Sequence, residues 1–344
     1  MTTPKQRVIG SSELWHQVLQ QASQVAPLNR PVLLVGERGT GKELIAERLH
    51  YLSLRWQQPY LQVNCAAMTE NLLESELFGH EMGAFTGATR SRAGLFERAD
   101  GGTLFLDELA TASLPVQEKL LRVIEYGRFE RVGGSKTLQV DVRVVAACNE
   151  DLPTLVTQGR FRGDLLDRLA FDVLNLPPLR YRKEDIAELA EHFALRMCLE
   201  LGYDFFSGFA PPAMQQLLAH DWPGNVRELK NVVERSIYRH ADPSKPVAEM
   251  VLDPFVSPWR TPPVTSSNMT EAEPDLPMSA QAPMSCDLKA ELAQFEQRLI
   301  QRALQQQHFN QRRTAQVLGL SYDQLRAALR KYPHLLTERN NTNQ

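Results

Sequence analysis

Residues 36–43 read Gly-Glu-Arg-Gly-Thr-Gly-Lys-Glu and follow the apolar run Val-Leu-Leu-Val. Three glycines let the backbone approach a phosphate closely, and the amide groups from Glu37 to Lys42 would face its oxygens. The Lys42 ammonium would reach the β- and γ-phosphates of a nucleotide, and Glu43 stands where Ser or Thr usually holds Mg²⁺. A loop of this kind between a strand and a helix predicts an α/β nucleotide-binding fold. A chance Gly-rich turn is the alternative.

Short apolar runs alternate with helical patterns from about Leu14 to Phe171. We expect four of these runs to be buried strands: 32–36, 60–65, 103–108 and 142–149. Buried strands joined by crossover helices are typical of an α/β domain with a mostly parallel sheet. After Pro177-Pro178 the pattern becomes helical, which predicts a helical subdomain with helices near 185–200, 212–220 and 225–239.

The apolar run 103–106 ends in two carboxylates, Asp107 and Glu108. In a nucleotide site, a first carboxylate at such a position binds Mg²⁺ through water, and a second orients or deprotonates the attacking water. We therefore expect hydrolysis as well as binding, with Asp107 as the metal-binding residue. A solvated acidic pair after a strand is the alternative.

Two arginines, Arg162 and Arg168, lie six residues apart in the segment Gly-Arg-Phe-Arg-Gly-Asp-Leu-Leu-Asp-Arg-Leu. Arginines at a subunit edge stabilise the γ-phosphate charge in a neighbouring subunit's site. Ion pairs with Asp164 and Asp167 on the same helix are an equally good interpretation. Arg227, in Trp-Pro-Gly-Asn-Val-Arg-Glu-Leu-Lys-Asn, opens a helix of the second subdomain and would close over the nucleotide from there.

Residues 83–88 place one aromatic and one hydroxyl side chain on a backbone of the smallest residues: Gly83, Ala84, Phe85, Thr86, Gly87 and Ala88. The two glycines supply the conformational freedom of a turn tip, and the alanines offer Phe85 little to pack against. This favours a role for Phe85 outside its own fold. A turn that folds the ring back into the core is the alternative.

The C-terminal part combines a linker composition with a helix-turn-helix pattern. Nine prolines fall within 241–287, a segment without periodicity, which predicts a flexible linker. Helical periodicity returns at Leu288, and a helix over 311–318, a turn at 319–320 and a helix over 322–331 capped by Ser321 follow.

Basic residues dominate this last segment, because 288–333 holds eight Lys or Arg against three Asp or Glu. A local positive charge on a helix-turn-helix indicates double-stranded DNA as the partner. The candidate DNA-binding residues are Arg312, Arg313, Tyr322, Gln324, Arg326, Arg330 and Lys331. A helical hairpin for dimerisation is the alternative.

Composition excludes several other classes of protein. The 344 residues are 43% hydrophobic and 23% charged, as in ordinary globular domains. The first ten residues lack the apolar stretch of a signal peptide, and no segment approaches the ~20 apolar residues of a membrane span. The four cysteines have no metal-binding spacing. We expect a cytoplasmic protein without membrane insertion and with reduced cysteines.

The motifs described above occur in the order seen in AAA+ activators of sigma-54 RNA polymerase, and the chain resembles that family from about Val8 to Arg239. The resemblance implies a hexameric ATPase that uses ATP and Mg²⁺, in which Glu43 is the usual residue at its position. It also implies that Asn64 pairs with Glu108 and that Asn149 is a nucleotide sensor. The residues assigned to the nucleotide on this basis are Gly36, Glu37, Arg38, Gly39, Thr40, Gly41, Lys42, Glu43, Ala99, Asp100, Gly101, Gly102, Thr103, Leu104, Phe105, Leu106, Asp107, Glu108, Asn149 and Arg227.

For the 83–88 loop the resemblance implies contact with sigma-54. ATP hydrolysis would move this loop, together with a second loop at 128–140, and convert a closed promoter complex into an open one at promoters with upstream enhancer DNA. The C-terminal segment resembles the Fis-type helix-turn-helix of these activators, with a packing set of Ala315, Leu318, Gly319, Leu320, Leu325 and Leu329.

Fewer than fifteen residues precede the first expected helix, so we expect control to come from another protein. Within the family, this short organisation resembles the activators of phage-shock stress genes, which the repressor PspA restrains in trans. Trp56 is our candidate docking residue, because polar Arg55, Gln57 and Gln58 surround it. A Trp folded over the domain edge is the alternative.

The expected organisation is an α/β AAA+ subdomain over 1–178, a helical lid over 179–240, a linker over 241–287, a helix-turn-helix over 288–333 and a tail over 334–344. Two other functions compete with ATP-dependent activation. One is a DNA-binding repressor with a vestigial ATPase, against which the intact 83–88 loop argues. The other is a AAA+ helicase or unfoldase, which would not need a terminal helix-turn-helix on a linker.

Overall fold

The computed structural model describes residues 8–240, 242–255, 288–307 and 310–333. The chain divides into two compact units, Met1–Pro258 and Trp259–Gln344. The expected tail, 334–344, and most of the expected linker, residues 241 and 256–287, lie outside the described residues.

A five-stranded parallel sheet in the order β2-β3-β6-β1-β7 forms the centre of the first unit. Its strands are β1 (Val32–Val35), β2 (Tyr60–Asn64), β3 (Thr103–Asp107), β6 (Arg143–Cys148) and β7 (Val173–Asn175). The four strands expected from the apolar runs are confirmed within a residue or two. The fifth, β7, is only three residues long, and its run is too short to stand out in the sequence.

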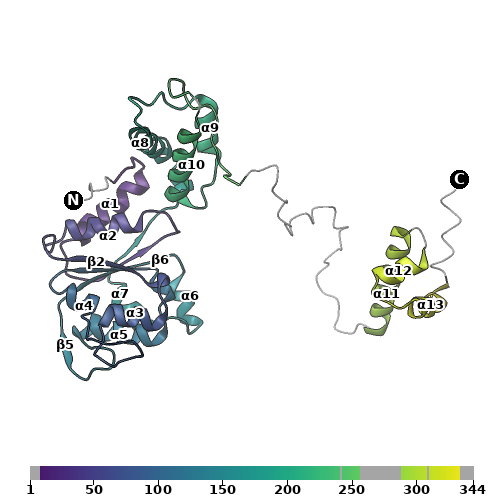
Figure 1. Ribbon diagram of the computed structural model, residues 1–344, viewed down its shortest axis with the longest axis horizontal. Helices are drawn as coiled ribbons and strands as arrows, with labels where there is room; N and C mark the ends of the chain where they lie inside the picture. Colours follow the sequence, from purple (N-terminus) through teal and green to yellow (C-terminus); the bar gives the residue numbers. More distant parts are fainter. Residues whose placement is uncertain (1–7, 241, 256–287, 308–309, 334–344) are drawn as a thin grey trace. The chain divides into compact units, whose positions relative to one another are not determined.

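Helices cover both faces of this sheet (Figure 1). Along a strand, successive side chains point to opposite faces, so Leu34 of β1 joins the core under α1 and α2, whereas Leu33 joins the core on the other face. The helices of the first face are α1 (Glu13–Val25) and α2 (Lys42–Tyr51). The helices that pack on the second face are α3 (Glu70–Phe78), α4 (Leu95–Arg98), α5 (Leu114–Tyr126), α6 (Leu152–Thr157) and α7 (Gly163–Leu169).

An antiparallel hairpin projects from this domain where the sequence indicated a second loop. Its strands are β4 (Arg128–Glu130) and β5 (Thr137–Gln139), paired through Phe129 and Leu138. The described residues of this unit also form three short 3₁₀ helices: η1 (Cys65–Ala67), η2 (Leu109–Thr111) and η3 (Leu179–Tyr181).

The lid contains α8 (Glu184–Leu201), α9 (Pro211–Ala219) and α10 (Asn225–Arg239), close to the expected bounds. Its core extends past residue 240, where we expected the linker to begin. Val247 and Met250 are buried against the lid helices, and the Ala210 amide donates to the Val247 carbonyl at 2.8 Å. Residues 242–255 are therefore part of the lid, because their few apolar side chains complete its core.

The second unit is a three-helix helix-turn-helix made of α11 (Leu288–Gln306), α12 (Gln311–Val317) and α13 (Tyr322–Lys331). Its core contains Ile300, Leu304, Ala315, Leu325, Leu329 and Tyr332, with Leu318 and Leu320 partly buried. Ser321 and Gln324 form a reciprocal capping box at the start of α13, as the predicted cap implied. Within the described part of the chain, no helix is long and apolar enough to cross a bilayer.

Candidate functional site

The phosphate loop connects β1 to α2 with its glycines in the conformations that glycine favours. Gly39 and Gly41 have φ of 77° and 104°. A Cβ on Gly39 would lie 2.3 Å from the carbonyl oxygen of Gly224 in the lid, so no larger residue fits there. Thr40 is buried, and its hydroxyl donates to the Glu37 carbonyl at 2.9 Å.

Lys42 is buried at the start of α2, and its ammonium donates to the carbonyls of Gly36 at 2.7 Å and Glu37 at 3.0 Å. Burial lowers the pKa of Lys42, although the nearby Asp107 carboxylate opposes this change. The loop thus holds a desolvated cation at the amino end of a helix, where phosphate groups bind well.

Asp107 ends β3 at the same edge of the sheet as the phosphate loop, because all five strands run parallel. Burial raises the pKa of the Asp107 carboxyl. A half-buried carboxylate close to a buried ammonium fits a site for a metal ion and a phosphate. The metal ion would balance the charge of the carboxylate, and the phosphate would balance the charge of the ammonium. The donor set therefore suits Mg²⁺ bound to a nucleotide.

The family resemblance implied that Asn64 pairs with Glu108, but in the structure the Asn64 side chain lies against Asp107 instead. Its amide nitrogen lies 3.4 Å from Asp107 Oδ2, and its oxygen accepts the Ala66 amide at 2.9 Å. The cause is the register of the sheet, in which Asn64 of β2 stands directly opposite Asp107 of β3. Glu108 instead forms an ion pair with Arg38, with Oε1 and Nη2 separated by 3.3 Å.

The expected second nucleotide segment, 99–108, reaches the site only through its last two residues. Ala99, Asp100, Gly101 and Gly102 precede β3 at its amino end, about 16 Å from the site at ~3.3 Å per residue. The next four residues, Thr103, Leu104, Phe105 and Leu106, are buried in the sheet. These eight residues lie in β3 or at its amino end, away from the phosphate loop, and their assignment to the nucleotide stays a prediction. Asn149, by contrast, is exposed directly after β6, beside the phosphate loop.

The phosphate loop is tied to the lid by contacts that the sequence did not reveal. Both Arg180 amino groups donate to the Glu37 carboxylate, at 2.8 and 2.5 Å. The Asn225 amide donates to Glu37 Oε2 at 3.1 Å and to the Arg38 carbonyl at 3.0 Å, and it accepts the Leu179 amide at 2.8 Å. The Arg180 and Asn225 hydrogen bonds lower the pKa of Glu37 to about 2.

The Cβ of Arg227 lies close to the phosphate loop, at the start of the lid helix α10. The Val226 amide donates to the Gly39 carbonyl at 3.0 Å, and a Cβ on Gly39 would lie 3.0 Å from the Cβ of Arg227. The Arg227 side chain is exposed. A further lid residue, Arg182, is fully buried and donates to the Thr40 carbonyl at 3.0 Å.

The two candidate trans arginines, half-buried Arg162 and exposed Arg168, have acidic neighbours within their own chain. Arg162 pairs with Asp164 at 2.7 Å, as the alternative interpretation implied, and Arg168 pairs with Glu125 at 2.5 Å. The structure does not bring either side chain to the phosphate loop of the same chain. Their exposure is compatible with action on a neighbouring subunit.

The 83–88 loop is a turn whose two glycines face open space. The Gly83 amide donates to the Ala88 carbonyl at 2.8 Å, and a Cβ on Gly83 or Gly87 would meet no atom within 4 Å. The Phe85 ring is 46% exposed and lies against His80, with ring centroids 5.0 Å apart. Phe85 is therefore not folded back into the core.

The β4–β5 hairpin lies against the base of this turn. The Glu81 amide donates to the Val132 carbonyl at 3.0 Å, and a Cβ on Gly133 would lie 2.8 Å from that of Ala84. Arg131 also pairs with Glu81 and with Glu97, at 3.0 and 2.6 Å. The two loops are therefore one connected unit.

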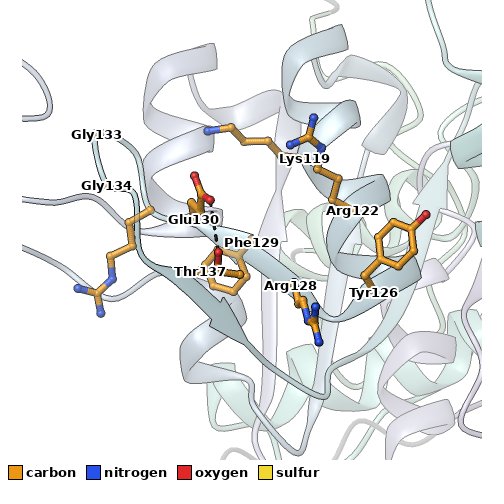
Figure 2. Close-up of a pocket in the computed structure, with 10 residues that line it drawn as sticks. Lys119, Arg122, Tyr126, Arg128, Phe129, Glu130, Gly133, Gly134 and Thr137 are labelled. Atoms are coloured by element: carbon orange, nitrogen blue, oxygen red, sulfur yellow. Dashed lines mark hydrogen bonds between the residues drawn. The ribbon is translucent and has the colours of Figure 1, made fainter.

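A hollow of about 670 Å³ opens between the hairpin and α5 (Figure 2). Its walls include Lys119, Arg122 and Tyr126 of α5 and Arg128 of β4. It lies beside the hairpin and contains none of the candidate nucleotide residues.

The candidate DNA-binding side chains all lie at the surface of the second unit: Arg312, Arg313, Tyr322, Gln324, Arg326, Arg330 and Lys331. Lys331 pairs with Glu296 at 3.2 Å, which fixes the end of α13 on α11. In the first unit, Trp56 lies in the connection between α2 and β2 and is 55% exposed, next to the exposed Leu54.

A parallel sheet with a phosphate loop, an acidic pair after a neighbouring strand and a helical lid defines an AAA+ module, here followed by a helix-turn-helix. Three protein-family models match the chain in the same order. They are the Sigma-54 interaction domain at 8–175, the AAA+ ATPase lid domain at 180–253 and the bacterial regulatory protein, Fis family, at 291–332. The chain belongs to the sigma-54-dependent AAA+ transcription activators, and the expected fold class is confirmed.

Several known proteins are similar over most of the chain. The Psp operon transcriptional activator of Escherichia coli K12 is 56% identical over 334 residues, which cover 96% of this chain and 99% of the relative. The regulatory protein AtoC of the same organism is 42% identical, with 94% and 67% covered. The crystal structure of NtrX from Brucella abortus in complex with ADP has a TM-score of 0.67 at 33% identity and covers 95% of this chain and 70% of NtrX. NtrX in complex with ATP gives the same TM-score at 32% identity, with 94% and 69% covered.

The low pKa of Glu37 gives a testable pH dependence of stability. A carboxyl whose pKa falls from 4.5 to about 2 on folding stabilises the protein above pH 4.5, and this contribution is lost as the pH falls toward 2. Glu37→Gln should lower the free energy of unfolding by less than about 1 kcal/mol at pH 7, because exposed pairs are screened by solvent and these side chains are 39% and 34% exposed. Urea unfolding followed by circular dichroism measures this difference.

The difference between the parent and Glu37→Gln should shrink as the pH is lowered below 4.5. Glu234→Gln removes a carboxylate from an exposed pair on α10 and serves as the control. A Glu37→Gln difference that stays constant or grows on acidification would contradict the assignment.

Proposed function

We propose that this protein hydrolyses ATP and uses the energy to convert the closed promoter complex of sigma-54 RNA polymerase into the open complex. We assign its action to phage-shock promoters, in line with the name of the similar Psp operon transcriptional activator. The observation that carries the proposal is the 83–88 loop, whose residues Phe85, Thr86 and Gly87 are exposed while its base is hydrogen-bonded to the nucleotide-binding domain.

The chemistry assigns one task to each group at the carboxyl edge of the sheet. The phosphates of ATP would lie on the loop amides, with Lys42 turned from the two carbonyls toward them. Mg²⁺, held by Asp107 through water, would neutralise phosphate charge. Glu108 would orient the attacking water, and Asn149 and Arg227 would contact the phosphates from β6 and the lid.

We further propose that six copies form a ring and that each site is completed by the neighbouring subunit. Arg162 and Arg168 support this, because their side chains reach solvent and pair with Asp164 and Glu125 rather than with the phosphate loop of their own chain. In the ring, the guanidinium groups of the two arginines would leave Asp164 and Glu125 and stabilise the charge that develops on the γ-phosphate of the neighbouring subunit.

A continuous path leads from the hydrolysis site to Phe85. Asn64 contacts Asp107, and the chain then passes through η1 and α3, which ends at Phe78 just before the loop. A change of charge at Asp107 would shift Asn64 and be carried along α3 to the loop and its attached hairpin. Phe85 and Thr86 would then act on sigma-54 without taking part in the chemistry.

The helix-turn-helix would hold the activator on enhancer DNA. Tyr322, Gln324 and Arg326 lie in the first half of α13, the part that enters the major groove in such motifs. Arg312 and Arg313 on α12, with Arg330 and Lys331 at the end of α13, would contact phosphates.

Control in trans by a PspA-type repressor completes the proposal. Leu54 and Trp56 are 87% and 55% exposed, and both belong to the α2–β2 connection, two residues apart in the sequence. Large exposed apolar side chains that adjoin one another are typical of protein-binding surfaces.

Glu108→Gln should keep nucleotide affinity within about threefold but lower ATP turnover at least ~100-fold, because an amide cannot accept the proton of water. Steady-state ATPase assays and open-complex formation on a sigma-54 promoter measure both effects. Glu118→Gln, an exposed acid on α5, is the control. If the parent protein melts no promoter DNA in an ATP-dependent manner, the proposed function fails.

Phe85→Ala should leave ATP turnover within about twofold of the parent and weaken sigma-54 binding about tenfold or more, because the ring contributes its contact area only to the partner. Binding to sigma-54 in the presence of a transition-state analogue of ATP measures this loss. Phe205→Ala removes a more exposed ring, 61% exposed, from the lid and should bind normally. Full affinity of Phe85→Ala would mean that the ring only packs against His80.

Trp56→Ala should weaken binding of the repressor about tenfold or more and leave ATPase activity unchanged in its absence. Titration of PspA against ATP turnover measures the effect, with Tyr238→Ala, an exposed aromatic residue on α10, as the control. Repression of Trp56→Ala at the parent's PspA concentration would remove Trp56 from the docking surface.

A further inference from the structure

Residues 8–12, which precede α1, contact both subdomains of the first unit, and we call them the strap. Val8 packs against the core under α1 and α2, whereas Ile9 packs against the core of the lid. Gly10 has φ of 138°, and a Cβ there would lie 2.9 Å from Asp185 Oδ2. The strap therefore fits closely over the junction between the sheet domain and the lid.

One lid residue, Asp185, holds the strap through its carboxylate. Asp185 lies in α8 and is fully buried. Its Oδ1 accepts the amides of Ser11 and Ser12 at 2.8 and 2.7 Å, and its Oδ2 accepts the Ser12 hydroxyl at 2.8 Å. Ser12 also caps α1, because its hydroxyl oxygen accepts the Trp15 amide at 3.4 Å. The carboxylate thus fixes the chain at the point where α1 begins.

Arg182 connects this carboxylate to the phosphate loop. Its buried guanidinium lies 3.6 Å from Asp185 Oδ2 through Nη1 and donates to the Thr40 carbonyl at 3.0 Å through Nη2. The Arg182 Cζ also lies 4.3 Å from the centroid of the Trp15 ring. Its Nε has no acceptor among the described residues. Compensation of the buried charge therefore depends on Asp185, the Thr40 carbonyl and the Trp15 ring together.

The energetics of the Arg182–Asp185 pair indicate a role in positioning. Removing two charges from water offsets most of the attraction between them, so a buried ion pair adds little net stability. Removing one partner, however, leaves the other buried without a counter-charge. The groups that the pair joins are therefore held in one arrangement, which is what a link between the strap and the loop requires.

We propose that Asp185 and Arg182 are positioning residues that join the strap to the phosphate loop, so that nucleotide binding at the loop also orders the strap. Phosphates bound to the loop amides would fix the loop, and with it the Thr40 carbonyl that Arg182 binds. Arg182 would then hold Asp185, and Asp185 would hold the strap. Coupling of this kind is reciprocal, so the anchored strap in turn favours the loop conformation that binds phosphate. This inference rests on the proposed binding of ATP and extends it to residues 8–12.

Amide hydrogen exchange in the full-length protein tests the link directly. The probe is Mg²⁺ with a non-hydrolysable ATP analogue at a saturating concentration. It should slow exchange of the Ser11 and Ser12 amides about threefold or more in the parent, and should have no such effect in Arg182→Lys, because an ammonium cannot bind both partners in the same geometry. The Ala210 amide, which bonds to Val247 within the lid, reports on any general change of stability. Exchange that does not respond to nucleotide in the parent, or responds equally in Arg182→Lys, would overturn the inference.

A double-mutant cycle on the dissociation constant of the same analogue tests whether the junction acts as one unit. Ser12→Ala and Arg182→Lys change the two sides of Asp185, whereas Asp185→Asn would leave the guanidinium uncompensated and risk loss of the fold. Each of the two variants should weaken binding about three- to tenfold. The double variant should bind no more weakly than the weaker of the two, because either change breaks the link. Effects that multiply would overturn the inference, and so would parent affinity in both single variants.

Steady-state kinetics separate positioning from a general loss of structure. Ser12→Ala should raise KM for ATP about three- to tenfold with kcat within about twofold, and Ser12→Thr, which keeps the hydroxyl, should restore the parent's KM. Ser23→Ala on α1 and Arg196→Lys on α8 change exposed residues and should match the parent. A fall in kcat of more than tenfold at unchanged KM would overturn the inference, because the junction would then act in the transition state.

The two proposals fail in different ways. A parent protein that binds the analogue but does not turn over ATP would contradict the proposed hydrolysis, while exchange at Ser11 and Ser12 would still report whether the strap responds to nucleotide. Normal turnover together with a strap that does not respond would overturn the role of Asp185 and Arg182 alone.

Discussion

Parallel pairing of the five strands is the constraint on which the site depends. Because every strand ends at the same edge, the phosphate loop after β1, Asp107 and Glu108 after β3, Asn64 at the end of β2 and Asn149 after β6 meet there, although they are far apart in sequence. The register also sets which groups touch. Asn64 faces Asp107 because β2 and β3 pair residue for residue, and this leaves Glu108 to the loop.

The sequence was sufficient for most of the fold because most elements, though not the short strand β7, carry a local signal. Buried strands appear as apolar runs, the loop as glycines beside Lys42, and α13 as Ser321 followed by its helical pattern. The partners of Glu37 and Glu108 could not be predicted in this way. Arg180 lies 143 residues from Glu37, and nothing local distinguishes it from other surface arginines. The predicted end of the lid at residue 240 was wrong for a related reason. Residues 242–255 have only two buried apolar side chains among prolines, a composition that resembles a linker.

The nucleotide-binding domain presents two kinds of surface with different physical properties. At the phosphate loop, Glu37, the Arg38 carbonyl and Lys42 have hydrogen-bond partners, and the backbone contacts the lid at close range. At the 83–88 turn, a Cβ on either glycine would meet no atom within 4 Å, and the exposed aromatic ring lies against His80. The first surface is held by several contacts, which suits chemistry. The second depends on the hairpin behind it for its position, which suits a segment that moves against a partner.

The contact between the lid and the phosphate loop includes a hydrogen bond from the Val226 amide to the Gly39 carbonyl, to which no side chain contributes. Substitution of Val226 by any residue except proline leaves both bonding atoms in place, whereas a larger residue at Gly39 would clash with the Gly224 carbonyl. Mutational scans of side chains would therefore underestimate how strongly the lid follows the loop. Replacing the backbone amide of Val226 by an ester would remove the donor. The resulting change would measure how much this backbone hydrogen bond contributes to the contact between the lid and the loop.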